Sequence, residues 1–333
     1  SPDRASQRAT DLGFSRHTDK WQDVVNDPKV ELISVCTPNN THSEIAISAL
    51  KTGKHVWCEK PMSSSMEDSQ KMAEASLNTN AKTIIGYNYT KNPIVIHAKE
   101  IIEKGTIGRV SGFFCRYDVD NEADGKKPWS WRMSKKLSGT GANGDILSHV
   151  ISIAHYLTNS KISRVVGDIS IIHNKRIDPK NSGKTKEVDN DDMVSALVHF
   201  ENGVHGHIGA SRVSWGKKCG LTWEVHGTEG TICYNQERLN EIKLFTRQKD
   251  SSTDGFRTIL SGPDHPFYSS FLPNGGHGLG FMDVKICELQ GLLNSIENDE
   301  PTWPSFTDGL AIEKVMESVD ISAINKKWIS IKY

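Results

Sequence analysis

Three side chains in the sequence have the types and spacing that proton transfer at an alcohol requires. Lys60 follows an apolar run at residues 55–58 and precedes Pro61. Asp145 and His149 stand four residues apart in a segment that we expect to be helical, and this spacing places both on one helical face. A lysine after a strand and an Asp–His pair on a helix are each common surface features when taken alone. Together they indicate an enzyme that moves a hydride and a proton.

The first part of the chain, which must position Lys60, alternates between short apolar runs and helical segments. The expected strands are residues 32–36, 55–58 and 83–86, and the expected helices between them are residues 43–51 and 66–77. This alternation predicts a parallel sheet with helices on both faces. Ligands bind at the C-terminal ends of the strands in such sheets. Polar segments follow the strands at residues 37–39, 59–61 and 86–88.

Strands dominate after about residue 109. Apolar segments between residues 112 and 234 have the length of strands, and early on only a helix at 145–157 interrupts them. Asn202 and Gly203 form a pair that is typical of a hairpin connection. We therefore expect a largely antiparallel sheet with helices on one face. The predicted domains are residues 1–108 and 109–333.

Composition and charge exclude several classes of protein. The chain has 333 residues, which corresponds to about two domains. Its 40 Lys and Arg residues balance 41 Asp and Glu residues, so no net charge favours nucleic acid or a membrane as a partner. The 6 cysteines form no Cys-x-x-Cys pair, a pattern typical of reduced thiols in a cytoplasmic protein. We predict no metal site: His205 and His207 fit a polar sheet face, with a metal site as the alternative.

Three motifs, in this order, resemble those of the Gfo/Idh/MocA family of NAD(P)-dependent oxidoreductases. Residues 35–42 are similar to its strand-end motif Thr-Pro-Asn-x-x-His, and residues 53–61 to its Gly-Lys-His-Val-x-x-Glu-Lys-Pro motif. Residues 144–157 resemble its Gly-Asp-x-x-x-His helix, with Ser152 in place of the family's second aspartate. The resemblance covers essentially the whole chain. Residues 128–132 and 223–230 resemble a branch that acts on inositols, sugars or anhydrosugars.

The resemblance implies a function and a fold. The expected reaction transfers a hydride between a secondary alcohol of a cyclic polyol or sugar and NAD or NADP. Chains of this family open with a strand, a Gly-x-Gly-x-x-Gly turn, a helix and a second strand, and residues 1–5 resemble the segment that follows them. We therefore expect roughly 30 residues ahead of Ser1, the alternative being a member without the turn. The expected fold is α/β: an N-terminally incomplete Rossmann-type parallel sheet, followed by an α+β domain with a large, mostly antiparallel sheet.

By the same resemblance, Lys60, Asp145 and His149 are the expected catalytic residues. His149 is the best general base, because an unperturbed imidazole titrates near neutrality. Asp145 would orient it, and Lys60 would hold the reacting oxygen and stabilise developing negative charge. The expected cofactor contacts are Thr37, Pro38, Asn39, His42, Glu59, Lys60, Asn88, Trp131 and Arg132. The expected substrate contacts are Arg116, Asn121, Arg132, Asp145 and His149, and for Arg116, Asn121 and Arg132 a solvated surface position is the alternative.

Two other functions fit the same fold. One is a non-catalytic regulator that senses a sugar or a dinucleotide, and the other is a sugar hydrolase or lyase that holds NAD tightly. Two structural predictions accompany these hypotheses. The uncovered face of the large sheet should be buried in a homodimer or homotetramer. The bond between Lys60 and Pro61 should be cis, because it follows a strand directly and must aim a side chain into the cleft.

Overall fold

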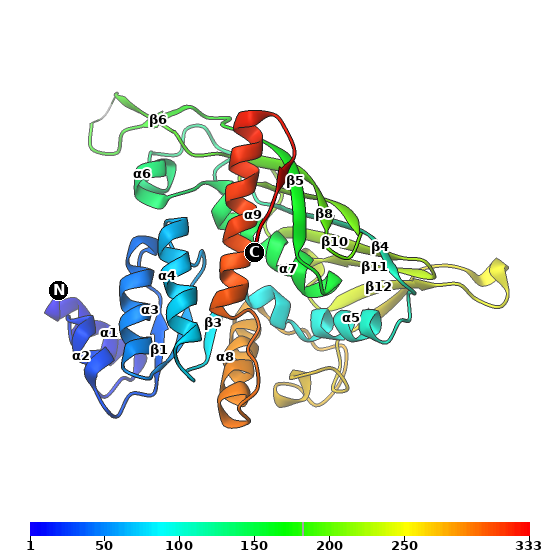
Figure 1. The fold of residues 1–333 in the computed structure, drawn as a ribbon, viewed down its shortest axis with the longest axis horizontal. Coiled ribbons are helices and arrows are strands. Elements are labelled where there is room, and N and C mark those ends of the chain that lie inside the picture. Colours follow the sequence, from blue (N-terminus) through cyan, green and yellow to red (C-terminus); the bar gives the residue numbers. More distant parts are fainter. Residues whose placement is uncertain (182) are drawn as a thin grey trace. The chain divides into compact units, whose positions relative to one another are not determined.

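The chain divides into two compact units in the computed structural model, which describes residues 1–181 and 183–333. Unit one comprises Ser1–Gly86 and Ser295–Leu310, and unit two comprises Tyr87–Asn294 and Ala311–Tyr333 (Figure 1). The division after Gly86 lies earlier than the predicted boundary at residue 108. Helix α5 (Pro93–Glu103), which we had placed in the first domain, therefore belongs to unit two.

Unit one contains the predicted parallel sheet. Its strands are β1 (Leu32–Val35), β2 (His55–Cys58) and β3 (Thr83–Ile85), in that order and all parallel. The helices of this unit's N-terminal segment are α1 (Pro2–Leu12), α2 (Trp21–Asn26), α3 (His42–Lys51) and α4 (Met66–Leu77). Helix α3 packs on β1 and β2 and lies beside α4 (Figure 1). The apolar residues Val35, Val56 and Ile84 form the buried centre of the sheet, which explains why these runs pair as strands.

A segment far away in sequence completes unit one. The Ile85 amide donates to the Pro304 carbonyl at 2.9 Å, and the Thr302 hydroxyl donates to the Thr83 carbonyl at 2.6 Å. Gly309 lies so close to the sheet that a Cβ atom there would come within 2.9 Å of Ile85 and Met62. These contacts place Ser295–Leu310 with the N-terminal strands, which no local pattern could have predicted.

Unit two is built on a nine-stranded sheet in the order β13-β12-β11-β10-β4-β9-β8-β5-β14. Only β4 and β9 pair in parallel, so the predicted, mostly antiparallel sheet is confirmed. The strands in chain order are β4 (Val110–Asp118), β5 (Ile162–Ser170), β8 (Met193–Phe200), β9 (His205–Ser211), β10 (Gly220–Gly227), β11 (Gly230–Asn235), β12 (Glu241–Thr246), β13 (Arg257–Leu260) and β14 (Ile329–Ser330). A separate hairpin pairs β6 (Lys175–Ile177) with β7 (Thr185–Glu187).

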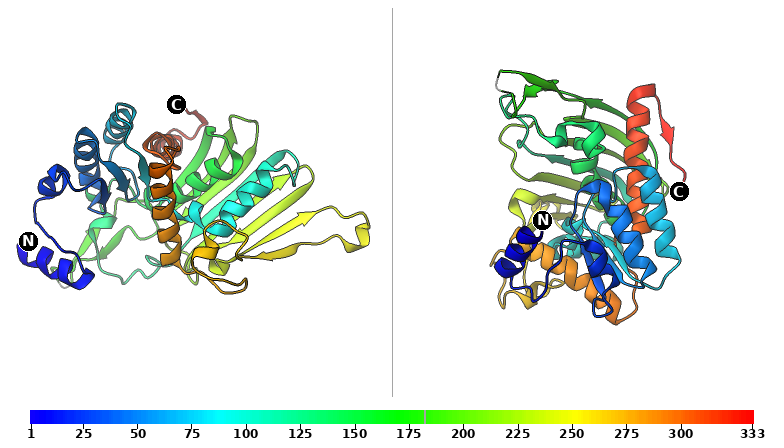
Figure 2. Two further views of the ribbon diagram at one scale, coloured as in Figure 1. Left: turned by 90° about the horizontal axis from the view of Figure 1, so that it is seen from below. Right: turned by 90° about the vertical axis from the view of Figure 1, so that its left-hand side faces the viewer.

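The two faces of this sheet differ. Helices α5 and α7 (Ser148–Thr158) lie side by side on one face (Figure 2), where Phe113, Cys115 and Tyr117 of β4 are buried. On the opposite face Phe114 is 45% exposed and Leu197 is 53% exposed. The alternation of buried and exposed residues follows from the period of two in a strand.

The remaining helices are α6 (Lys135–Ser138), α8 (Phe281–Glu297) and α9 (Phe306–Asn325). Across the residues that the structure describes, no helix combines the length and apolar character needed to cross a membrane. The peptide bond between Lys60 and Pro61 is cis, as predicted.

Candidate active site

The C-terminal edge of the sheet in unit one gathers most of the residues predicted to contact the cofactor. Val35 of β1 pairs with Cys58 of β2, so Thr37 and Lys60 each lie two residues beyond the same pair. The Thr41 hydroxyl fixes the first loop because it lies 2.7 Å from both the Thr37 hydroxyl and the Pro38 carbonyl. Parallel pairing therefore brings the two loops to one edge, where ligands bind in such sheets. These loops contain Thr37, Pro38, Asn39, Glu59 and Lys60.

We predicted that His42 contacts the cofactor directly. In the structure its ring is buried and contacts two loops of unit one. Its side chain is buried, with 1% of its surface exposed. Its Nε2 atom lies 2.8 Å from the Thr37 carbonyl oxygen, and its Nδ1 atom lies 3.1 Å from the Pro61 carbonyl oxygen. His42 therefore ties the loop after β1 to the loop that contains Lys60.

In unit two, Asp145 lies in a π-helical turn at Asn143–Leu147 that leads directly into α7. We had expected one regular α-helix from Asp145 to Leu157, so the first turn is wider than predicted. Single π-helical turns occur often at functional sites, because they change the direction of individual side chains. The Asp145 amide donates to the Gly141 carbonyl at 3.0 Å.

His149 lies in the first turn of α7 and is packed between three tyrosine rings. Its ring centroid is 5.5 Å from that of Tyr87, 4.7 Å from that of Tyr89 and 5.9 Å from that of Tyr117. Asp145 also lies by Tyr89: burial raises the pKa of the Tyr89 phenol, and the negative charge of Asp145 adds to that rise. Asp145 and His149 are therefore close to the same tyrosine, as expected for two residues on one face.

Tyr89 and Tyr117 were not among the residues predicted from the sequence. Their hydroxyl oxygens lie 2.9 Å apart, and the Cys219 sulfur lies 3.7 Å from Tyr89 and 3.5 Å from Tyr117. Burial raises the pKa of both phenols, so both are protonated at neutral pH and act as hydrogen-bond donors. The sequence did contain a signal for Tyr117. It stands at every second position with the apolar residues Phe113 and Cys115, so all three lie on the same face of the strand.

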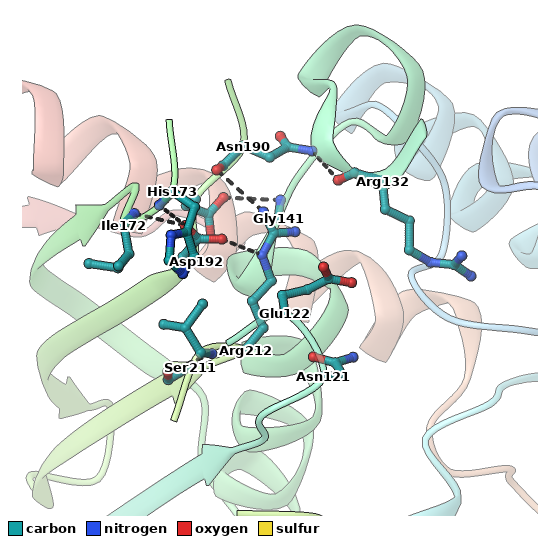
Figure 3. A network of polar contacts seen from close by, with 12 residues as sticks. Asn121, Glu122, Arg132, Gly141, Ile172, His173, Asn190, Asp192, Ser211 and Arg212 are labelled. Carbon is teal, nitrogen blue, oxygen red and sulfur yellow. Dashed lines mark hydrogen bonds and ion pairs between the residues drawn. The ribbon is translucent and has the colours of Figure 1, made fainter. Parts of the chain in front are cut away.

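Asn88 and Arg132 belong to unit two. Asn88 is 2% exposed, and its Nδ2 atom has no hydrogen-bond partner among the described residues. A buried amide of this kind fits a ligand that supplies an oxygen acceptor, such as a carboxamide or a ribose hydroxyl. Arg132 is exposed, and its guanidinium carbon lies 4.5 Å from the centre of the Trp131 ring. Its carbonyl oxygen accepts a hydrogen bond from Asn190 at 2.9 Å (Figure 3).

Arg116 and Asn121 are placed differently from the predicted substrate contacts. Arg116 points to the face of β4 opposite to Tyr117, where its guanidinium pairs with Asp118 at 3.0 and 3.1 Å. Because Tyr117 faces His149, Arg116 does not lie with the Asp–His pair, and we exclude it from the candidate site. Asn121 is an exposed turn residue whose carbonyl accepts from Lys127 at 2.7 Å.

No group of three or more His, Cys, Asp or Glu side chains in the described ranges is arranged to hold a metal ion. His205 and His207 lie on the same open face of the sheet as Leu197, which pairs with His207.

Comparison with known proteins identifies the family. The family model described as the oxidoreductase family with an NAD-binding Rossmann fold (GFO/IDH/MocA) matches residues 1–87. A model of the C-terminal domain of the same family matches residues 95–233. The chain belongs to the Gfo/Idh/MocA family.

Relatives of known activity within this family act on sugars and inositols. Levoglucosan dehydrogenase of Pseudarthrobacter phenanthrenivorans is 34% identical over 344 residues, which cover 99% of this chain and 87% of the relative. Myo-inositol 2-dehydrogenase of Thermotoga maritima is 28% identical over 92% of this chain and 81% of its own length. A solved structure of levoglucosan dehydrogenase in complex with NADH and L-sorbose matches with a TM-score of 0.96 and 35% identity, covering 100% of this chain and 88% of that chain.

These comparisons confirm the predicted family and fold. They also confirm that the chain is an oxidoreductase with a nicotinamide-binding domain, whose relatives are sugar dehydrogenases. The roles of individual residues, the substrate and the state of assembly are the subject of the proposals below.

Proposed function

We propose that the protein is an NAD-dependent dehydrogenase that oxidises a secondary hydroxyl of a cyclic sugar, an anhydrosugar or an inositol. The observation that carries this proposal is the setting of His149: a buried imidazole enclosed by three tyrosine rings, one turn after the carboxylate of Asp145. Such a group is suited to take a proton from an alcohol that enters from solvent. The likeness to dehydrogenases of levoglucosan and myo-inositol supports the substrate class.

The roles of the residues follow from their chemistry. A bound nicotinamide supplies the acceptor for the hydride that leaves the carbinol carbon. His149 takes the hydroxyl proton, and Asp145 orients the imidazole. Lys60, on a strand-end loop of unit one, is suited to donate a hydrogen bond to an alcohol oxygen and to stabilise negative charge that develops there. The alcohol would lose its hydroxyl proton to His149 and become a ketone, with a bound nicotinamide supplying the acceptor for the hydride.

Residues suited to contact the cofactor are present in each unit taken by itself. Thr37, Pro38, Asn39 and Glu59 lie on the strand-end loops of unit one, and the unpaired amide of Asn88 offers donors from unit two. His42 would act indirectly, because it holds these loops together through its two ring nitrogens. We favour NAD over NADP, since the family model describes an NAD-binding fold and NADH is bound in a similar solved structure.

An assay of the protein expressed from its complete coding sequence tests this function. The substrates to compare are levoglucosan, myo-inositol and a hexose, each with NAD and with NADP. We expect sugar-dependent reduction of NAD with at least one of them. Binding of NAD without reduction by any sugar would support the regulator instead, and cleavage of a sugar without net reduction of NAD would support the hydrolase or lyase.

We also propose that the protein forms a homodimer or homotetramer through the open face of the nine-stranded sheet. On that face Phe114 and Leu197 are 45% and 53% exposed, and they lie among the polar residues Arg116, His205 and His207. An exposed apolar sheet face tends to be buried against a partner. The commonest arrangement that buries such a face is a second copy of the same chain related by a twofold axis.

Replacing Leu197 with Asp is expected to lower the mass of the particle to that of a monomer, because a charge at this position opposes its burial against a second copy. Light scattering at micromolar protein concentration measures this mass. The control is Leu77→Asp, since Leu77 is 73% exposed on α4 and belongs to unit one rather than to the nine-stranded sheet. A wild-type protein with the mass of a monomer, or equal masses for both variants, would contradict the proposal.

We infer a cytoplasmic location. The support is the state of the cysteines, all six of which are free thiols, with Cys58, Cys115 and Cys287 buried. Burial raises the pKa of the Cys58 and Cys115 thiols, which keeps them unreactive. Free thiols of this kind are typical of a reducing compartment.

A further inference from the structure

Three consecutive buried residues immediately before β8 connect two segments of the candidate site to the sheet. They are Asn190, Asp191 and Asp192, with exposed fractions of 1%, 8% and 1%. None of the three was predicted from the sequence to have a role. Their side chains bind different neighbours, and Figure 3 shows Asn190 and Asp192 within this network.

Asn190 holds the segment that contains Arg132. Its Nδ2 atom lies 2.9 Å from the Arg132 carbonyl oxygen, 2.6 Å from the Ser138 hydroxyl and 3.2 Å from the Thr140 carbonyl oxygen. One amide group thus spans both ends of the segment from Arg132 to Thr140. The path of the chain beside Arg132 depends on this contact.

Asp191 holds the start of the turn that contains Asp145. Its carboxylate accepts from the Gly141 amide at 3.0 Å and from the Asn143 amide at 2.6 Å. Its carbonyl accepts from the Ala142 amide at 2.9 Å. The first backbone N–H groups of a helix have no partner within the helix. At the N-terminal end of this π-helical turn, one residue satisfies three such successive donors.

The contact between Asp191 and Gly141 leaves no room for a side chain. A Cβ atom on Gly141 would lie 2.1 Å from the Asp191 carbonyl oxygen and 2.8 Å from its amide nitrogen. The turn is thus fixed against Asp191 by both hydrogen bonding and close packing.

Asp192 fixes the three residues themselves to the sheet. Its carboxylate accepts from the Arg212 guanidinium at 2.7 Å and from the Ile172 and His173 amides at 2.7 and 3.1 Å (Figure 3). The Asp192 amide also donates to the Ser170 carbonyl at 2.8 Å, and the Asp192 carbonyl accepts from the Arg212 amide at 3.0 Å. Asn190 and Asp191 therefore project from a rigid base.

We propose that Asn190 and Asp191 are positioning residues with separate tasks: Asp191 aligns the turn of Asp145 and His149 for proton transfer, and Asn190 aligns the Arg132 segment for ligand binding. This rests on the proposed dehydrogenase function. A displacement of about 1 Å in a catalytic group can cost roughly 100-fold in rate. The two residues should therefore affect different kinetic constants, although they are adjacent in sequence.

Asp191→Asn and Asn190→Ala test this division. In Asp191→Asn an NH₂ group faces a backbone donor, so we expect kcat to fall by ~10-fold or more with little change in KM. In Asn190→Ala we expect KM for NAD or for the sugar to rise by ~10-fold or more with kcat largely kept. The control is Ser322→Ala, which removes buried hydrogen bonds to Gly167 and Lys327, far along the chain in the same unit. It should lower thermal stability without either kinetic effect.

Backbone hydrogen exchange of the same variants decides the proposal independently of activity. Asp191→Asn should accelerate exchange at residues 141–147 and leave residues 129–138 as in the wild type, and Asn190→Ala should do the reverse. Equal acceleration of both segments in both variants, or a parallel loss of kcat in both, would overturn the division of tasks. An inactive wild type would refute the proposed function alone, because the exchange pattern would still decide whether each residue holds its own segment.

Discussion

Replacing Lys60 with Met is expected to lower kcat by at least ~10²-fold, because it removes the donor that stabilises negative charge on the reacting oxygen. Methionine keeps the length and the apolar stem of the side chain, so the loop after β2 should retain its packing. The kcat of Lys60→Arg should lie between those of the wild type and Lys60→Met, since arginine keeps the positive charge but places it differently. The measurement is steady-state reduction of NAD at saturating sugar.

The matched control for this variant is Lys51→Met, because Lys51 is an exposed lysine at the end of α3 in the same unit. It should have wild-type kcat. Turnover of Lys60→Met within a few-fold of the wild type would remove Lys60 from the mechanism, whatever the other residues do.

Replacing His149 with Ala is also expected to lower kcat by at least ~10²-fold, because it removes the general base. In the wild type the rate of oxidation should rise with pH, since a base accepts a proton only in its neutral form. The variant should lose this rise near neutrality. Asp145→Asn should have a smaller effect, because it leaves the imidazole in place. The measurement is the dependence of kcat/KM on pH.

His155 offers a control on the same helix. Burial lowers the pKa of His155 to about 3, and its Nε2 atom accepts from the Ile162 amide at 3.2 Å. This histidine stays neutral over the range of the assay, so His155→Gln should keep the wild-type pH profile even if it lowers stability. A rise with pH that persists in His149→Ala, or that disappears in His155→Gln, would assign the base to another group.

The sequence predicted the architecture because its signals are local. Alternating strands and helices indicated the parallel sheet, and the sequence motifs located Lys60, Asp145 and His149. The alternation of faces along β4 is also a local signal. Counted from the buried Phe113, it places Arg116 on the face opposite to Tyr117. This alternation alone separates Arg116 from the face that Tyr117 shares with His149.

Other features depend on contacts between distant segments and could not be derived from local patterns. Pairing of Pro304 with Ile85 assigns Ser295–Leu310 to unit one, across more than half of the chain. The π-helical turn at Asp145 depends on Asp191, whose side chain looks like one more charge in a polar stretch of sequence. The role of His42 changed for the same reason, because only the fold brings Pro61 to its ring.

Transfer of deuterium is the most direct test of the central claim, which is that this protein moves a hydride from a sugar carbinol to NAD. The sugar that is active in the assay is labelled at the carbon that becomes the ketone, and the nicotinamide product is analysed by mass spectrometry. We predict one deuterium in each NADH formed, both by the wild type and by the much slower turnover that His149→Ala retains. Conversion of the sugar without label in NADH, or binding of NAD with no transfer at all, would contradict it.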